Sequence, residues 1–278
     1  MNKKSQVLNT CSNCGENTKG SMLCAVCAGN PYLVEDGRDL VARNGDATLF
    51  KSLYKSSFPE IKNVNSGKFW NEHFNSALTL KDQDLMTRDK IHKIKSLIPN
   101  KKLKILDLGF GQGYIEELLN DNKNYELYGI DISSTAVKRA KKKFKGNFIT
   151  GDISKIETHY KKNFFDVILA LELMEHISPT KIFNFYKSLH SLLKPHGILI
   201  ISTPLNEDLR NKKENPSGHV RDYQPAVIKM EQELSGFRIL ESHTFYAFEK
   251  NYKIKKFLTR VFPNHWKPNN IVVKSEKM

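Results

Sequence analysis

The stretch that decides the fold is KILDLGFGQG, residues 104–113. Its first five residues form a mostly apolar run typical of a buried strand, and Gly109, Gly111 and Gly113 follow at once. Glycines at this spacing let a strand turn sharply into a helix while the backbone comes close to a ligand. The stretch therefore predicts a strand, a ligand-binding loop and a helix in direct succession.

Short apolar runs alternate with amphipathic segments in the part of the chain that follows Pro99. A helix is expected to begin with Ser178 as its N-cap and Pro179 in its first turn, and to end at residues 194–197. Alternation of this kind predicts a parallel sheet covered on both faces. The expected strands are 104–108, 127–130, 148–150, 165–171 and 198–202, and the other expected helices are 114–119 and 135–143.

The end of the chain has a different pattern. Residues 237–248 and 270–274 are expected to form two strands, and no clean crossover helix is visible between them. Parallel neighbours need such a crossover, whereas antiparallel ones do not. We therefore expect an antiparallel pair at one edge of the sheet.

Three acidic residues lie at or near the ends of the first three expected strands: Asp107, Asp131 and Asp152. They should line one crevice, because ligands of open α/β sheets bind at the carboxyl ends of the strands. Asp131 comes roughly 20 residues after the glycines, where an acid commonly binds a ribose diol. A dinucleotide site would need a third glycine where Tyr114 stands. The pattern favours a sulfonium nucleoside with an amino-acid tail.

Four motifs together resemble those of class I S-adenosylmethionine-dependent methyltransferases: residues 105–113, 129–131, 151–153 and 193–199. They occur in the family's order and spacing, and the resemblance covers about residues 99–278. It implies an α/β, Rossmann-like fold with a seven-stranded, mostly parallel sheet whose last hairpin is antiparallel. It also implies a methyltransferase that uses S-adenosylmethionine.

The resemblance further implies a role for each motif. Asp107 and the glycine loop would hold the methionine part, Asp131 the ribose hydroxyls, and Asp152 with the Ile153 backbone the adenine. A helical cap at residues 31–98 would act as a lid over cofactor and substrate. The full set of implied cofactor-binding residues is Asp107, Gly109, Gly111, Gln112, Gly113, Asp131, Ile132, Asp152, Ile153 and Leu171.

Residues 169–177, LALELMEHI, end an apolar strand in Glu172, Glu175 and His176. This string is similar to that of quinone-biosynthesis O-methyltransferases and small-RNA 2′-O-methyltransferases, whose two Glu and one His, with a later His, bind metal. His219 is the candidate for the later ligand. In that interpretation the four side chains bind Mg²⁺ or Mn²⁺, which would lower the pKa of a coordinated hydroxyl.

Two other interpretations of the same string stay open. His176 or His219 acts as a general base without metal while Glu172 orients the substrate or the base, because an imidazole titrates near working pH. Alternatively, Glu175 and His176 merely begin a helix, where carboxylates are favoured. The residues Asn/Asp-Pro-Pro-aromatic, which are usual in methyltransferases of exocyclic base nitrogens, are absent here.

All four cysteines lie in the N-terminal segment 1–30, as Cys11, Cys14, Cys24 and Cys27. Two C-x-x-C pairs can close a tetrahedral site, and four thiolates leave no open position, so a structural zinc ion is expected. Disulfides, an iron–sulfur centre and a redox pair are the alternatives. In the cap that follows, residues 85–98 have the clearest helical spacing, and the aromatic stretch 69–74 is expected to form its core.

The chain has 278 residues and a formal net charge of +14, which invites a nucleic-acid hypothesis. Its basic cluster at 138–145 falls on an expected helix, however, where a solvated outer face explains it. The N-terminus lacks the apolar stretch of a signal peptide, and no run approaches the roughly 20 apolar residues that span a bilayer. A cytoplasmic location is expected.

Three hypotheses for the function follow. The leading one is an O-methyltransferase that acts on a hydroxyl of a small metabolite, such as a sugar, a phenol or a biosynthetic intermediate. The second is an RNA 2′-O-methyltransferase, suggested by the charge, the cysteines and residues 169–177. The third is an S-adenosylmethionine-binding scaffold without activity whose zinc segment docks a partner. The sequence does not indicate an oligomeric state.

Overall fold

The computed structural model describes residues 9–10, 17–18, 62–207, 209, 216–262 and 265–278. The four cysteines and residues 31–61 of the expected cap lie outside these ranges, so the zinc site remains a prediction. Strands β1 (Asn9–Thr10) and β2 (Asn17–Thr18) pair antiparallel on either side of the first C-x-x-C pair in the sequence.

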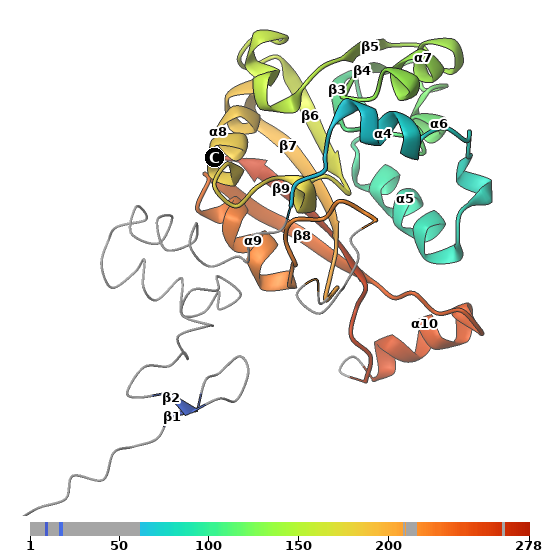
Figure 1. The fold of residues 1–278 in the computed structure, drawn as a ribbon, viewed down its shortest axis with the longest axis vertical. Coiled ribbons are helices and arrows are strands. Elements are labelled where there is room, and N and C mark those ends of the chain that lie inside the picture. Colours follow the sequence, from blue (N-terminus) through green and yellow to red (C-terminus); the bar gives the residue numbers. More distant parts are fainter. Residues whose placement is uncertain (1–8, 11–16, 19–61, 208, 210–215, 263–264) are drawn as a thin grey trace, which may run out of the picture.

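The main sheet has seven strands in the order β5-β4-β3-β6-β7-β9-β8 (Figure 1). The strands from β5 to β7 pair in parallel, whereas β9 pairs antiparallel with both β7 and β8. This topology confirms the predicted mostly parallel sheet with an antiparallel last pair. The bounds are β3 (Leu103–Leu108), β4 (Tyr125–Asp131), β5 (Asn147–Thr150), β6 (Phe165–Leu171), β7 (Leu193–Pro204), β8 (Phe237–Phe245) and β9 (Asn270–Lys277).

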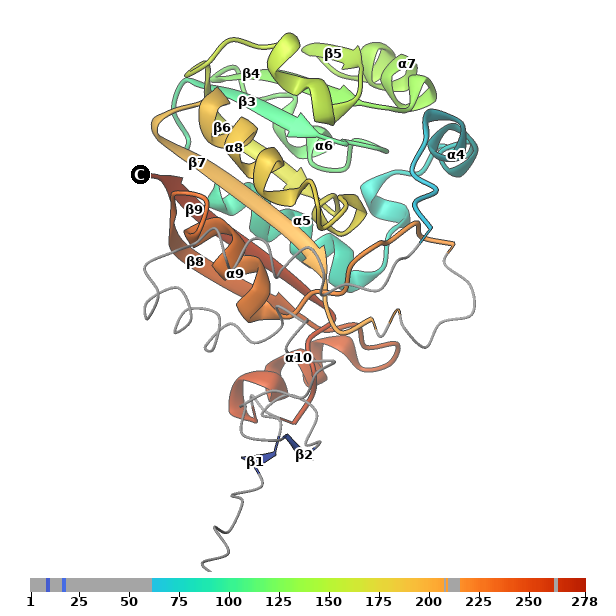
Figure 2. The same cartoon turned by 60° about the vertical axis from the view of Figure 1, so that its left-hand side comes forward.

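Helices cover both faces of this sheet (Figure 2). On one face pack α5 (Leu85–Leu97), α6 (Glu116–Leu119) and α7 (Ser134–Lys143); on the other pack α8 (Ile182–Leu192) and α9 (Pro225–Glu233). β6 reads FDVILAL and is buried along most of its length, as expected for a central parallel strand. The remaining elements are α4 (Gly67–His73), η1 (Leu80–Asp82), η2 (Ile153–Thr158), η3 (Met174–His176) and α10 (Tyr252–Val261).

The start and end predicted for α8 are wrong. Residues 178–181 form a turn in which the Lys181 N–H donates to the Ser178 carbonyl at 2.9 Å, and the helix begins only at Ile182. The Ser178 hydroxyl lies 2.9 Å from that of Thr180 instead of capping a helix. Residues 194–197 belong to β7, because that strand continues along β6 back to Leu193.

The prediction of an antiparallel last pair without a crossover helix is confirmed, because β8 and β9 pair antiparallel. The connection between them contains a helix that was not identified from the sequence. α10 lies there, and the chain returns from it to pair β9 with β8 from Asn270 to Lys277. Three of the apolar side chains of α10, Ile254, Phe257 and Val261, are exposed, whereas surface helices normally bury their apolar side.

The basic cluster on α7 is a solvated face, as predicted. Lys138, Lys141 and Lys142 are exposed, whereas Ala136 and Ala140 pack against the sheet. Among the helices that the structure describes, none has the length and apolar character required to cross a bilayer.

Candidate active site

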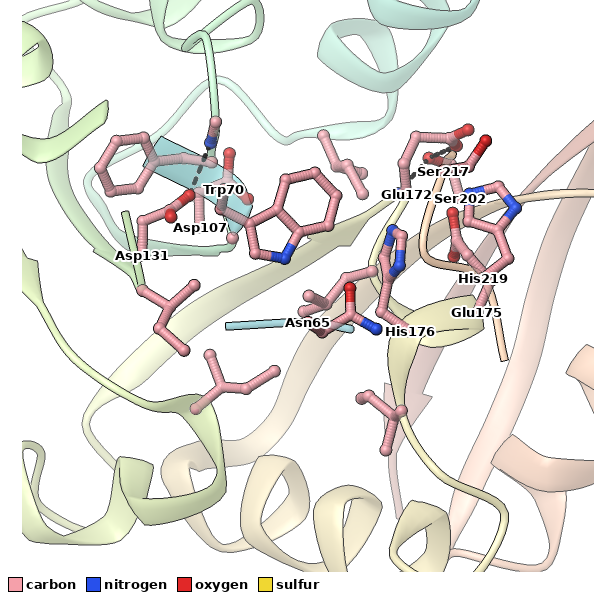
Figure 3. Close-up of a pocket in the computed structure, with 18 of the residues that line it drawn as sticks. Asn65, Trp70, Asp107, Asp131, Glu172, Glu175, His176, Ser202, Ser217 and His219 are labelled. Atoms are coloured by element: carbon pink, nitrogen blue, oxygen red, sulfur yellow. Dashed lines mark hydrogen bonds between the residues drawn. The ribbon is translucent and has the colours of Figure 1, made fainter. Parts of the chain in front are cut away.

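A cavity of about 1210 Å³ opens at the carboxyl ends of β3, β4 and β6 (Figure 3). All these strands run parallel and therefore end at the same edge of the sheet. Of the predicted cofactor-binding residues, nine line this cavity: Asp107, Gly109, Gly111, Gln112, Asp131, Ile132, Asp152, Ile153 and Leu171.

The glycine loop passes close to neighbouring side chains. Gly109 and Gly111 have φ angles of +65° and +52°, which side chains rarely adopt. A Cβ on Gly111 would lie 2.9 Å from Cζ of Phe74, so glycine is needed there for space as well. Gly113 packs against Phe144 instead, and it is not among the residues that line the cavity.

Asp131 closes the loop against the end of β4. One carboxylate oxygen accepts the Gly111 N–H at 2.8 Å, and the other accepts the Ser133 N–H at 2.7 Å. Burial raises the pKa of Asp131, while the two N–H donors oppose that shift. The carboxylate that was expected to meet a ribose therefore also holds the loop in shape.

Asp107 and Glu116 form a buried acidic pair under the loop. Burial, and then the charge and hydrogen bond of Glu116, raise the pKa of Asp107 well above its usual range. Burial also raises the pKa of Glu116, to about 7. A positively charged ligand nearby would stabilise the ionised pair.

Glu116→Gln should therefore change the pH dependence of stability in the cofactor-free protein. When folding raises the pKa of a carboxyl, the free energy of unfolding of the protein falls as pH rises from the unfolded pKa through the folded pKa. The free energy of unfolding of the variant, relative to that of wild type, should therefore be roughly 1–3 kcal/mol higher above about pH 7 than at acidic pH. Urea unfolding at several pH values measures this difference, and Glu157→Gln on the surface is the control. A constant difference between variant and wild type would contradict the assignment.

Two other predicted cofactor residues have local partners as well. Asp152 accepts the Ser154 N–H at 2.8 Å and so caps η2. The Gln112 amide donates to the Ser76 carbonyl at 2.9 Å and accepts from Arg139, which ties the loop to the segment after α4.

α4 borders the cavity between the glycine loop and the histidines. Its Asn71 side-chain oxygen accepts the Ser133 hydroxyl at 2.8 Å, and Trp70, His73 and Phe74 line the cavity. None of the α4 side chains is fully buried. The expectation that these aromatic residues form a core holds only for Phe74, which is partly buried against the apolar side chains of α5 and the sheet, whereas Trp70 and His73 face the cavity.

Glu172 is bound by its neighbours. Its carboxylate accepts from Ser202 at 2.6 Å and from Asn270 at 2.9 Å, and it forms an ion pair with Lys90 at 3.0 Å. Although burial alone would raise the pKa of Glu172, the Lys90 charge and these donors outweigh it and lower the pKa. The side chain is 41% exposed and lines the cavity as a carboxylate that Lys90 and the two donors keep in place.

Glu175, His176 and His219 come together, with one potential ligand atom from each within 4.8 Å of the others. Glu175 is fully buried; one of its oxygens accepts from Thr203 at 3.1 Å, and the other has no hydrogen-bond partner. Glu172 is not part of this group, because Lys90 takes its charge. Three of the four predicted metal ligands are thus adjacent, and the fourth is engaged elsewhere.

Both histidines have their Nδ1 atoms occupied. His176 Nδ1 donates to the Gly218 carbonyl at 3.2 Å, and His219 Nδ1 lies 2.5 Å from a Glu207 carboxylate oxygen. Burial, and then the neighbouring His219, lower the pKa of His176 to about 4, so its ring is neutral at working pH. A neutral ring that donates from Nδ1 carries its lone pair on Nε2, the usual arrangement of metal-binding histidines. The donor set therefore fits a divalent cation.

Among the residues of the site that were not predicted are Trp70, Lys90 and Glu207. The aromatic stretch contains Trp70, but it predicted a place in a core, whereas the side chain lines the cavity. Lys90 is only 4% exposed. Nothing in the sequence of α5 distinguishes it from the other lysines of the same helix. Glu207 is twelve residues from His219 in a connecting segment, so only the fold brings it to the imidazole.

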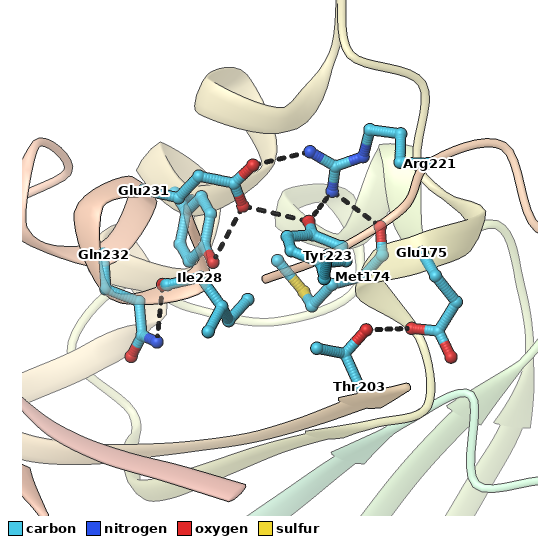
Figure 4. A network of polar contacts seen from close by, with 9 residues as sticks. Met174, Glu175, Thr203, Arg221, Tyr223, Ile228, Glu231 and Gln232 are labelled. Carbon is cyan, nitrogen blue, oxygen red and sulfur yellow. Dashed lines mark hydrogen bonds and ion pairs between the residues drawn. The ribbon is translucent and has the colours of Figure 1, made fainter. Parts of the chain in front are cut away.

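A buried ion pair supports the turn that carries Glu175 and His176 (Figure 4). Arg221 and Glu231 are fully buried, and their side chains meet at 2.6 Å. Arg221 also donates to the Met174 carbonyl at 2.7 Å, and Tyr223 donates to Glu231 at 3.0 Å. The Val220 N–H donates to the Glu175 carbonyl at 2.8 Å, so the segment 219–223 holds η3 from the side.

Two relatives have similar sequences. An uncharacterized protein of Methanocaldococcus jannaschii is 29% identical over 188 residues, which cover 66% of this chain and 78% of that protein. The ubiquinone biosynthesis O-methyltransferase of Pelagibacter ubique is 33% identical over 134 residues, which cover 48% of this chain and 51% of that enzyme. The chain thus matches about half the length of that enzyme.

Solved structures share the fold. An S-adenosylmethionine-dependent methyltransferase of Archaeoglobus fulgidus aligns with a TM-score of 0.55 at 20% identity, over 68% of this chain and 94% of that one. The N-methyltransferase NodS of Bradyrhizobium japonicum, solved with S-adenosyl-L-homocysteine, aligns with a TM-score of 0.55 at 16% identity. That alignment covers 75% of this chain and 98% of NodS.

Residues 99–257, more than half of the chain, match the family described as "Methyltransferase domain". The matched part contains the glycine loop, the strand-end acids and the cluster of Glu175, His176 and His219. This match, the fold of the solved relatives and the site agree with one another. The chain belongs to the methyltransferase domain family and is an S-adenosylmethionine-dependent methyltransferase.

Proposed function

We propose that the protein is an O-methyltransferase that modifies a hydroxyl group of a small metabolite with the help of Mg²⁺ or Mn²⁺. The observation that carries the proposal is the group of Glu175, His176 and His219, with its unpartnered buried oxygen and its two oriented imidazoles. The name of the Pelagibacter relative supports oxygen as the acceptor atom.

The reaction needs a nucleophilic oxygen in line with the sulfonium. The O–C bond forms as the C–S bond breaks, the electron pair stays on sulfur, and the hydroxyl proton is released. When bound, a dication would lower the pKa of the hydroxyl. Glu175, His176 and His219 would hold it, since carboxylate and imidazole are suitable ligands.

The other residues of the cavity bind and orient. Glu172, kept anionic by Lys90, would accept a hydrogen bond from the methyl acceptor. Trp70 lies edge-on to His176 with ring centroids 5.0 Å apart, so its ring would pack against the acceptor and exclude water. In this proposal α4 with the rest of the cap is the lid over both ligands.

In this proposal the cofactor is bound as the family resemblance implies: Asp107 and the glycine loop hold the methionine part, Asp131 the ribose, and Asp152 with Ile153 the adenine.

Asp131→Ala should lower the affinity for S-adenosylhomocysteine by roughly 10–100-fold, since charge-assisted hydrogen bonds are lost. Calorimetric titration measures the affinity, and circular dichroism shows whether the fold is kept. Asp121→Ala, on the surface, is the control. Unchanged affinity would remove the ribose assignment.

Manganese titration tests the proposed function. Calorimetry should show one Mn²⁺ site in the protein saturated with S-adenosylhomocysteine. After treatment with a mild chelator, transfer of labelled methyl from S-adenosylmethionine into a nucleotide-free metabolite extract should stop, and added Mn²⁺ or Mg²⁺ should restore it. Turnover that survives chelation, with no response to either ion, would refute metal assistance and favour His176 or His219 as a general base.

A second candidate is an RNA 2′-O-methyltransferase, which the net charge of +14 favours. Exposed lysines such as Lys141 and Lys142 on α7 would then contact phosphates. Methyl transfer to RNA should in that case fall steeply with salt. Activity on the metabolite extract and none on RNA would exclude this candidate.

The structural zinc ion is the remaining part of the proposal. Cys14→Ser should lower the zinc content and the thermal stability of the protein together, because four thiolates hold the ion and its binding stabilises the fold. Elemental analysis and a melting curve measure the two effects. Ser12→Ala between the same cysteines is the matched control. An unchanged zinc content would refute the four-thiolate site.

A further inference from the structure

α10 (Tyr252–Val261) stands apart from the sheet on the connection between β8 and β9 (Figures 1 and 2). The face that it turns to the protein is polar. Thr259 is 9% exposed, and the Lys256 ammonium pairs with Asp89 of α5 at 2.5 Å. Tyr252, 7% exposed, lies on the same face one turn before Lys256.

The outward face of α10 is apolar. Ile254, Phe257 and Val261 are 64%, 61% and 54% exposed, and Phe262 directly after the helix is 56% exposed. The spacing of three and four residues puts the first three on one stripe. Surface helices normally bury such a stripe and expose their polar side. An exposed apolar stripe of this size marks a contact surface.

The surroundings of the stripe are basic. Between Glu249 and Glu276 the sequence has seven lysines and arginines and no aspartate or glutamate. Lys253 and Arg260 are exposed on α10 itself, and Lys250 and Lys267 are exposed on the segments that flank it. Trp266 packs against Phe248 with ring centroids 5.6 Å apart and is partly exposed beside the helix.

We propose that α10 docks on an anionic phospholipid surface, with Ile254, Phe257, Val261 and Phe262 in the acyl boundary and the flanking basic side chains on the phosphates. Helices that lie in a membrane interface combine an apolar face with Lys and Arg at its sides, and tryptophan is enriched at that depth. A purely protein partner would explain the apolar stripe but not the run without acidic residues. The charge attracts lipid phosphates before contact and holds the helix afterwards.

This proposal does not depend on the identity of the methyl acceptor. It bears on the site because Asp89, which anchors Lys256, is next to Lys90, which pairs with Glu172 in the cavity. The same helix α5 therefore connects the docking surface with the methylation site.

Vesicle sedimentation with the full chain tests the proposal. The protein should sediment with vesicles of phosphatidylglycerol and phosphatidylcholine in equal parts, and not with phosphatidylcholine alone. High salt should weaken this binding, because ions screen exposed charges. Equal binding to the two kinds of vesicle would overturn the proposal.

Matched variants separate the apolar and basic contributions. Ile254→Ser with Phe257→Ser, and separately Lys253→Glu with Arg260→Glu, should each lower binding by roughly tenfold or more. The controls are Leu240→Ser, which is exposed on β8, and Lys141→Glu with Lys142→Glu on α7. These should bind nearly as wild type does. A loss as large in the controls would overturn the proposal, as would a wild-type dimer in ultracentrifugation that the serine variant dissociates.

Discussion

Glu175→Gln should lower the rate of methyl transfer by about 10²–10⁴-fold while the affinity for S-adenosylhomocysteine stays the same. Glutamine can still accept the Thr203 hydrogen bond, so only the negative charge is removed. Burial, and then the charge of Glu172, raise the pKa of Glu175, so a neutral amide of the same shape is tolerated at this buried position. The variant should consequently fold as well as wild type. Single-turnover methyl transfer and calorimetry measure the two quantities, and Glu157→Gln is the control.

The histidines separate the two mechanisms that use this cluster. If Glu175, His176 and His219 bind one ion, His176→Asn and His219→Asn should each weaken Mn²⁺ binding, since each removes one ligand. If a single histidine acts as a general base, one variant should lose activity and the other should retain most of it. A Glu175→Gln protein with wild-type turnover would contradict the metal mechanism, because that mechanism needs the carboxylate as a ligand.

Arg221→Met should lower the free energy of unfolding by about 3–5 kcal/mol, because it leaves the Glu231 carboxylate buried without its positively charged partner. Both side chains are fully buried, and burial raises the pKa of Glu231. The Met174 carbonyl would lose its donor as well. Urea unfolding measures the change.

A double variant distinguishes the cost of the unpaired charge from a general loss of packing. Arg221→Met with Glu231→Leu removes both charges and should recover a large part of the loss, as replacements of buried ion pairs by apolar residues do. Arg238→Met on the surface breaks an exposed pair with Glu276 and should cost less than about 1 kcal/mol. A double variant as unstable as Arg221→Met alone would show that the packing around the guanidinium, rather than the charge, is the important factor.

Most of the sheet was predictable from the sequence, because its signals are local. The apolar runs, the glycines at 109–113 and the acids at the strand ends lie within short windows. Chain connectivity then limits how such units assemble. The error at α8 occurred where a local pattern misleads, because Ser178 and Pro179 resemble a helix start but form a turn. The helix α10, whose apolar residues Ile254, Phe257 and Val261 are exposed, was not identified from the sequence.

The site was predictable in composition but not in arrangement. Residues 169–177 indicated a cluster of acids and histidine, and His219 was a correct candidate for its neighbour. Nothing local distinguishes Glu172 from Glu175, since both follow the same strand. The fold separates them, because Lys90 of α5 reaches Glu172, whereas Glu175 turns inward to Thr203.

The sequence by itself determined the parallel sheet, the edge at which the predicted cofactor-binding residues gather and the methyltransferase family. These features depend on neighbours in the chain and on strand direction, both of which are encoded locally. Only the tertiary structure decided which carboxylate meets a lysine, which partners the histidine Nδ1 atoms have and which face of α10 meets water. Each of these depends on contacts between residues far apart in the chain. The packing of the fold, and not the spacing of the residues in the sequence, sets the distances between their side chains.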